Sequence, residues 1–149
     1  MKNKVTLSIM VLLITGVLTS NVLADSKADI TDVIEKSYFN GAFNEQNTKS
    51  MKEGFHTDFA IFSPKGTELG KYPIAQWIAN TEKWKASPEY DKEKAKMDCK
   101  IVNLDVTGVC ASAKIELSEN GKLIWTDYLS LLKFENGWKI VAKVYHEHE

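Results

Sequence analysis

The chain has 149 residues and is nearly neutral, with 19 basic and 20 acidic side chains and a formal net charge of −1. This balance argues against nucleic acid or an anionic membrane surface as a partner, because both are bound by concentrated positive charge. All of the basic side chains are lysines, so the chain has no guanidinium group for a bidentate grip on phosphate or carboxylate.

Residues 1–24 have the features of a cleaved secretory signal peptide. Lys2 and Lys4 precede the apolar run "VTLSIMVLLITGVL", and the small residue Ala24 ends the cleavage-site sequence "NVLA". The apolar run is shorter than the ~20 residues that a membrane-spanning helix needs. The sequence therefore predicts an exported protein, periplasmic or secreted, with a single mature domain at residues 25–149 and no membrane partner after cleavage.

Helical periodicity predicts three helices in the first half of this domain. The first covers residues 28–43, with Asp29 as its N-cap, and has an apolar stripe at the spacing of one helix face. The stripe consists of Ile30, Val33, Ile34, Ser37, Tyr38 and Gly41. After the polar break "NEQN", the segment "TKSMKEGF" is predicted as a short helix with Gly54 as its C′ residue. "DFAIF" is predicted as a short strand stopped by "SPKG", and "KYPIAQWIANTEKW" as a helix with Pro73 at its start.

The second half of the domain changes to a two-residue period, which predicts four antiparallel strands. These strands are "MDCKIVNLDV", "VCASAKIEL", "KLIWTDYLSLLKF" and "WKIVAKVY". The predicted two-residue turns between them are Thr107-Gly108, Asn120-Gly121 and Asn136-Gly137. Asn-Gly between alternating runs is the strongest short hairpin signal, so the strands form a meander.

The two cysteines are predicted to be free thiols. If Thr107-Gly108 is a two-residue turn, Asp105 faces Cys110 across the hairpin. Cys99 then lies six residues farther along its strand, which is about 20 Å at ~3.3 Å per residue. A disulfide requires Cα atoms within ~7 Å of each other, so no bridge within the chain is expected.

Two segments carry a resemblance to a known family. "SYFNGAFNEQNTKSMKEGFHTDFAIFSP" is similar to the helix, polar break, short helix and loop of the nuclear transport factor 2-like (SnoaL-like) superfamily, and "DYLSLLKFENGWKIVAKVYH" is similar to its closing hairpin. With a signal peptide in front, the chain most resembles the exported branch called "putative lumazine-binding". The resemblance implies an α+β cone, in which three N-terminal helices pack on a strongly bent antiparallel sheet around a conical pocket. It also implies a homodimer through the sheet face.

The resemblance places candidate ligand-binding residues in this cone. In the steroid-isomerase branch, a helix tyrosine and a buried acid donate hydrogen bonds to an oxyanion, and these positions match Tyr38 and Asp127. The position of the proton-moving base is Ser63, so ketosteroid isomerase activity is not expected. We expect Tyr38 and Asp127 to face a common cavity beside Trp77, with a neutral Asp127 that donates to a ligand carbonyl.

The residues themselves leave other readings open. Tyr38 lies on the apolar helix stripe, which is also typical of a core tyrosine. Asp127 has apolar neighbours and must be hydrogen-bonded, protonated or paired, for example with Lys114 on a neighbouring strand. His56 has the chemistry of a general base, whereas the resemblance implies a histidine that ties its loop to the sheet.

The chain ends in "KVYHEHE", in which His146 and His148 are two residues apart. On an extended chain both would point the same way and could chelate a metal weakly. A zinc site needs three or four ligands, and no other histidine or cysteine is placed to complete one. A solvated tail without a metal site is therefore predicted.

Three functions fit these observations. The favoured hypothesis is a small-molecule-binding protein with an apolar or aromatic pocket lined by Tyr38, Trp77 and Asp127, without a cofactor. The first alternative is an enzyme of the cyclase, hydro-lyase or isomerase kind that uses Tyr38, Asp127 and His56. The second is a dimeric interaction module with a vestigial pocket. A buried and paired Asp127 without a cavity would favour the interaction module, and an open cavity would favour the other two.

Overall fold

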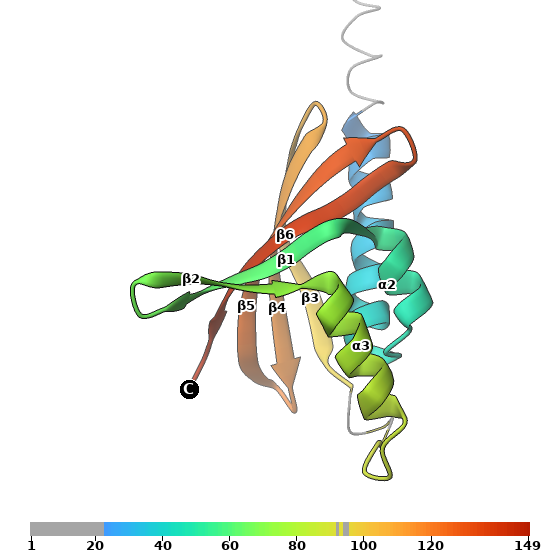
Figure 1. The fold of residues 1–149 in the computed structure, drawn as a ribbon. Coiled ribbons are helices and arrows are strands. Elements are labelled where there is room, and N and C mark those ends of the chain that lie inside the picture. The colour runs from blue at the N-terminus through green and yellow to red at the C-terminus, as the bar shows by residue number, and fades with distance from the viewer. Residues whose placement is uncertain (1–22, 92, 94–95) are drawn as a thin grey trace, which may run out of the picture.

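The computed structural model describes residues 23–91, 93 and 96–149 (Figure 1). The predicted signal peptide lies, apart from its last two residues, outside this part. Residues 23–33 are α-helical and continue without a break into the π-helical segment η1 (Ile34–Asn44), and α2 (Thr48–Gly54) and α3 (Ile74–Lys85) follow. Among the described residues, no helix combines the length and apolar character that crossing a membrane requires.

The first helix confirms the predicted stripe but not the predicted start. Ile30, Ile34 and Tyr38 are fully buried, as the helical spacing indicates. The helix already runs from residue 23, so Asp29 is an interior residue and not an N-cap. From Ile34 onward the turns widen, with the Glu45 N–H bonding to the Asn40 carbonyl five residues back. Tyr38 therefore lies in a π-helical segment, a rare conformation that often marks a functional site.

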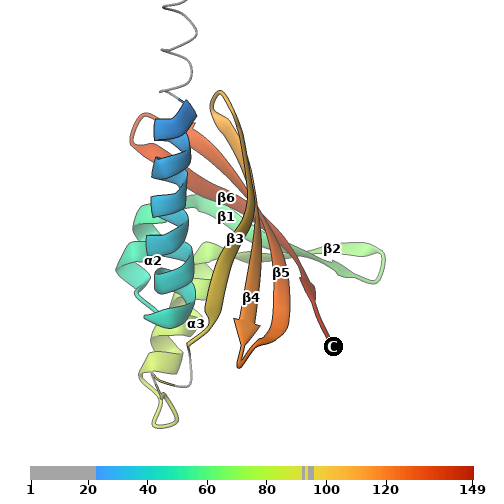
Figure 2. The ribbon, with the colours of Figure 1, turned by 180° about the vertical axis from the view of Figure 1, so that it is seen from behind.

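Six strands of the described residues form one sheet in the order β2-β1-β6-β5-β4-β3. Their bounds are β1 Phe55–Lys65, β2 Glu68–Pro73, β3 Asp98–Thr107, β4 Cys110–Glu119, β5 Lys122–Phe134 and β6 Gly137–Glu147. The four strands from β3 to β6 form the predicted antiparallel meander. β1 pairs antiparallel with β2 and parallel with β6. The sheet curls around the helices, which lie on one side of it (Figure 2), so the α+β cone is confirmed. The sheet is mixed and not purely antiparallel as predicted, because β1 and β6 are parallel.

Strand β1 is longer than the predicted "DFAIF", and β2 was not predicted. Pairing between β1 and β6 ends at Phe62, which faces Val144. Beyond that point β2 is the strand that pairs with β1, and Pro64 faces Leu69. A proline lacks the N–H that a strand between two neighbours must donate, and is tolerated at a sheet edge. The strand therefore continues through Ser63, Pro64 and Lys65 and ends before Gly66.

One of the three predicted turns lies where the sequence places it. Asn120 and Gly121 have φ angles of 51° and 79° and connect the paired residues Glu119 and Lys122, as a type I′ hairpin requires. The other two turns lie one residue away, at 108–109 and 135–136. A glycine next to a turn thus shows that a hairpin forms but does not fix its register.

The shift of the turn at 108–109 changes the predicted strand register. Cys110 faces Thr107, not Asp105, and Cys99 faces Leu117 near the other end of the same pair of strands. Both cysteines are free thiols, as predicted. Cys110 is exposed and Cys99 is half-buried, and burial raises the pKa of the Cys99 thiol to about 11.

This difference predicts unequal reactivity of the two thiols. At pH 8, iodoacetamide should modify Cys110 before Cys99. Only the thiolate form reacts, and the thiolate fraction falls about tenfold for each unit by which the pKa rises. Cys99 should therefore react about 100-fold more slowly than an ordinary exposed thiol. Peptide mass spectrometry over a time course measures both rates. Unfolding in urea is the control and should make the two rates similar. Equal rates in the folded protein would contradict the burial of Cys99.

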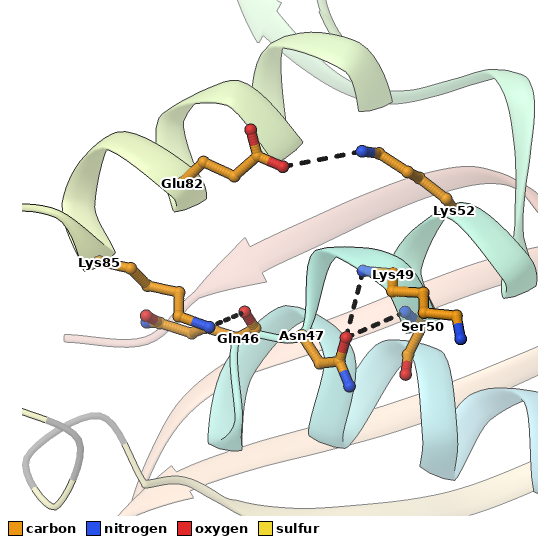
Figure 3. A network of polar contacts seen from close by, with 7 residues as sticks. All are labelled: Gln46, Asn47, Lys49, Ser50, Lys52, Glu82 and Lys85. Atoms are coloured by element: carbon orange, nitrogen blue, oxygen red, sulfur yellow. Dashed lines mark hydrogen bonds and ion pairs between the residues drawn. The ribbon is translucent and has the colours of Figure 1, made fainter.

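Polar contacts hold α2 and α3 together on the same side of the sheet (Figure 3). The side chain of Asn47 caps α2 by accepting hydrogen bonds from the N–H groups of Lys49 and Ser50, at 3.1 and 3.3 Å. Lys52 of α2 lies 3.7 Å from Glu82 of α3. The Lys85 ammonium donates to the Gln46 carbonyl at 2.9 Å. The contacts of Glu82 and Lys85 thus connect α3, which carries Trp77, to α2 and to the segment between η1 and α2.

Gly54 ends α2 for a reason that differs from the predicted one. A C′ glycine has a positive φ angle, but Gly54 is the last helical residue and is not among those with positive φ. A Cβ atom at this position would lie 2.3 Å from the Cβ of Ser37. Glycine is therefore required because α2 and η1 approach each other closely here.

Candidate functional site

Three polar side chains meet in the interior of the cone. Lys143 Nζ donates to the Tyr38 hydroxyl at 2.7 Å and lies 2.9 Å from Asp127 Oδ2. The Tyr38 hydroxyl donates to the same carboxylate oxygen. Tyr38 and Asp127 are fully buried, and Lys143 is 6% exposed. We call this group the Tyr38–Asp127–Lys143 triad.

Each member of the triad comes from a different element. Tyr38 projects from η1, Asp127 from the middle of β5 and Lys143 from β6. Asp127 is buried together with its apolar neighbours Leu129 and Leu131, which are two and four residues along the same strand. The period-two alternation of β5 therefore directs the carboxylate into the core.

Lys143 points inward because β6 contains a bulge. Ser130 faces Ala142 and Leu131 faces Ile140, so Val141 has no partner on β5. Alternation from the buried Ile140 would direct Lys143 to the outer face of the sheet. The extra residue reverses the alternation, and the Lys143 side chain enters the core. Sequence reasoning missed Lys143 for this reason, since the segment "WKIVAKVY" has no glycine or proline to mark the bulge.

Aromatic rings surround the Lys143 amine. Its Nζ lies between 5.2 and 5.8 Å from the ring centroids of Tyr38, Phe43, Trp77 and Tyr145. Trp77 is half-buried, and its ring packs edge-on against Tyr38 and Phe43 with centroids 6.3 and 6.0 Å away. Ring faces at this distance attract a cation. They also exclude water from the amine.

The surroundings shift the pKa values of two triad members, Lys143 and Tyr38. Burial lowers the pKa of Lys143, against the opposing effect of the Asp127 carboxylate. Burial, together with the charge of Asp127 and the hydrogen bond to it, raises the pKa of Tyr38 well above its usual range. The phenol therefore remains a proton donor at any physiological pH. The other carboxylate oxygen, Asp127 Oδ1, is buried and accepts no hydrogen bond from the described residues.

The structure brings together the candidate residues that the resemblance suggested, and Lys143 is an additional partner that was not predicted. Tyr38 and Asp127 are in direct contact and Trp77 lies beside them. Asp127, however, accepts hydrogen bonds from Tyr38 and Lys143, so the expected neutral donor to a ligand carbonyl is not the arrangement found. Lys114 faces Tyr128 across the strands and does not pair with Asp127.

The triad is buried, and none of its three side chains lines a hollow identified among the described residues. The four hollows that the described residues are known to line are bounded by other side chains. One of them, about 390 Å³, reaches Phe43, whose ring contacts Tyr38 with centroids 5.2 Å apart. We call it the Phe43 hollow. It is lined by Ala42, Phe43, Gln46, Trp84, Glu89, Asp91, Met97, Glu119 and Trp125. Phe43 thus lines this hollow and also contacts the triad.

His56 lies away from these residues, near the start of β1. Its ring stacks on Phe134 of β5, with centroids 4.9 Å apart and planes at 16°. Its Nδ1 atom accepts a hydrogen bond from the Asp58 N–H at 3.1 Å. The stacking connects β1 to β5, the hydrogen bond lies within β1, and neither contact involves the triad.

Most of the C-terminal segment is exposed to solvent, as predicted, but it is hydrogen-bonded to β5 and is not a frayed tail. β6 continues through Glu147, and the His148 N–H donates to the Ile124 carbonyl at 2.8 Å. His148 Nε2 also lies 2.9 Å from the Thr126 hydroxyl. The strand pairing with β5 holds this segment in place, which period and composition do not reveal. No group of three or more metal-ligating side chains is found among the described residues.

Comparisons with known proteins agree with this architecture. The sequence profile of a family described as "Putative lumazine-binding" matches residues 25–146. A solved NTF2-like protein of unknown function from Methylobacillus flagellatus is 31% identical, with a TM-score of 0.60 over 84% of this chain and 94% of that one. Another, from Shewanella baltica, is 26% identical, with a TM-score of 0.65 over 85% and 96%. A curated relative, the aldolase FrzH of a Cladobotryum species, is 27% identical over 107 residues, which are 72% of this chain and 81% of that protein.

Proposed function

Because the chain belongs to the family described as "Putative lumazine-binding", we propose that it is an exported protein that binds a small apolar or aromatic molecule in its cone. The observation that carries this proposal is the Tyr38–Asp127–Lys143 triad. A buried ion pair contributes little to stability, and apolar residues of the same size often stabilise a core more. Its position inside an aromatic cage (Tyr38, Phe43, Trp77, Tyr145) therefore favours a role in ligand binding over a role in packing.

The Phe43 hollow is the proposed entry to this site. A ligand in it would contact Phe43, Met97 and Trp125. Phe43 is half-buried, and rotation of its ring would bring the ligand to the triad. Asp127 Oδ1, which has no hydrogen-bond donor among the described residues, would then accept from the ligand.

Export and dimerisation are parts of the same proposal. Export is supported by the signal-peptide features of residues 1–24 and by the family match, which begins at residue 25. Dimerisation through the sheet face is supported by Tyr128 and Val144, which face each other on β5 and β6 and are 51% and 49% exposed. Sedimentation of a Tyr128→Lys variant tests this face, and the proposal requires it to be monomeric.

Two observations support alternatives. The name of the aldolase relative supports an enzyme that acts on a carbonyl compound. The complete burial and pairing of Asp127 support the interaction module with a vestigial pocket. The experiment for the proposed function must therefore detect a ligand independently of activity and of dimerisation.

Native mass spectrometry of protein purified from its own exported fraction tests whether a small molecule co-purifies. Lumazine and other small aromatic compounds should raise the melting temperature, since a ligand at about 100 times its Kd stabilises by about 2.7 kcal/mol. Trp125→Ala, at the Phe43 hollow, should abolish the rise. Leu69→Ala, which truncates a side chain that is 71% exposed on β2, is the control and should preserve it. An intact dimer that neither retains nor binds any compound would indicate the interaction module.

A further inference from the structure

The geometry points to a covalent function for the triad: we propose that the Lys143 amine forms an imine with the carbonyl carbon of an aldehyde or ketone ligand. This inference rests on the proposed binding function, because the carbonyl compound must first enter the cone. It assigns a chemical class to the ligand and a nucleophile to the site.

The burial of Lys143 sets it apart from the other lysines. Among the described residues it is the one buried lysine. An amine attacks a carbonyl in its neutral form, and removal from water increases the fraction of a lysine that is in this form. The ring contacts and Asp127 favour the ammonium, but burial is the larger effect and lowers the pKa of Lys143.

Partly exposed aromatic rings cover the amine. Phe43 and Trp77 are half-buried and Tyr145 is 41% exposed, and all three rings lie within 5.8 Å of Nζ. Movement of one ring therefore exposes the amine to a ligand. The same rings provide an apolar surface for an aliphatic or aromatic carbonyl compound.

Tyr38 and Asp127 are placed to move the protons of the reaction. The Nζ lone pair attacks the carbonyl carbon, and a C–N bond forms as the carbonyl oxygen takes the proton of the Tyr38 hydroxyl, 2.7 Å from Nζ. The proton released by nitrogen returns to the phenolate through Asp127, which contacts both groups. Tyr38 then protonates the carbinolamine hydroxyl, water leaves as the C=N bond forms, and the phenolate recovers the proton of the iminium nitrogen. The net change is one imine and one water, with no oxidant or reductant.

Reductive trapping tests this inference. The full mature chain is incubated briefly at pH 7 with benzaldehyde and sodium cyanoborohydride, which reduces an imine to a stable secondary amine. Peptide mass spectrometry should find the benzyl adduct on Lys143 at a level at least tenfold above that on the exposed Lys133. Lys143→Arg, which keeps a cationic side chain but does not form an imine, should abolish the adduct, and Lys133→Arg should not change its yield. Tyr38→Phe should slow trapping at Lys143 at least tenfold.

Benzyl alcohol separates the failure of this inference from the failure of the proposed function, because it has the same ring and no carbonyl group. A melting-temperature rise with benzyl alcohol but no adduct on Lys143 would overturn the imine and leave the binding function in place. Equal labelling of Lys143 and Lys133 would also overturn it. No rise with benzyl alcohol or benzaldehyde, together with no adduct, would count against both proposals.

Discussion

Replacing Asp127 with leucine should lower the free energy of unfolding by about 3–5 kcal/mol, the usual cost of removing one partner from a buried ion pair. Leucine has the same number of side-chain heavy atoms and is larger, so the loss does not arise from a cavity. It arises because Lys143, 6% exposed, loses the carboxylate 2.9 Å away, and because the Tyr38 hydroxyl loses its acceptor. Thermal unfolding measures the effect, and the melting temperature should fall by about 10 °C or more.

The control for this prediction is the double variant Asp127→Leu with Lys143→Met. It removes both charges, so no buried charge is left without a partner, and it should recover most of the lost stability. If the single and double variants unfold at the same temperature, the cost is due to packing and not to the unpaired amine. If Asp127→Leu has the stability of the parent protein, the triad is not formed as described.

Replacing Gly54 with alanine should lower the free energy of unfolding by about 2–3 kcal/mol, near the upper end of the usual cost of overpacking. The new methyl group would lie 2.1 Å from Ser37 Oγ and 2.3 Å from Ser37 Cβ. Rotation of the serine hydroxyl cannot relieve the second contact, because a Cβ atom is fixed by its backbone. The segments α2 and η1 must separate, which disturbs the helix that carries Tyr38. Urea denaturation followed by circular dichroism measures the loss.

Removal of the Ser37 side chain tests whether its contact with the new methyl group causes the loss of stability. Ser37→Gly removes the Cβ and the hydroxyl, so it should restore stability to the Gly54→Ala protein, although glycine in a helix itself costs about 1 kcal/mol. The two substitutions should therefore be strongly non-additive. Additive losses would show that the close approach of the two segments is not what requires a glycine at this position.

The parts of the fold that could be predicted are those that depend on residues near one another in sequence. The spacing of Ile30, Ile34 and Tyr38 indicates the buried face of a helix whether its turns are α or π. Asn120-Gly121 fixes a type I′ turn because both residues accept positive φ angles. The family resemblance predicted that Tyr38 and Asp127 lie close together, which no local sequence pattern indicates.

The parts that could not be predicted depend on contacts between distant segments. The inward direction of Lys143 depends on the bulge at Val141, whose position is set by pairing with β5. The requirement for Gly54 depends on the approach of Ser37. Strand β2 and the ordered C-terminal segment likewise exist because a neighbouring strand supplies hydrogen bonds. Hydrophobic periodicity and secondary-structure propensity describe one segment at a time and do not indicate which distant segments will contact it.

The parallel pair β1–β6 has a consequence for how the protein reaches its native state. Phe55, at the start of β1, faces Ile140 in β6. The two strands of this pair are therefore far apart in the sequence. Such non-local pairing must overcome a large loop-closure entropy before its contacts stabilise the chain, which makes folding slow. β6 also leaves the ribosome after the other five strands of the sheet. A nascent chain therefore cannot complete this sheet, and the edge of β1 that pairs with β6 remains without its partner until β6 has emerged.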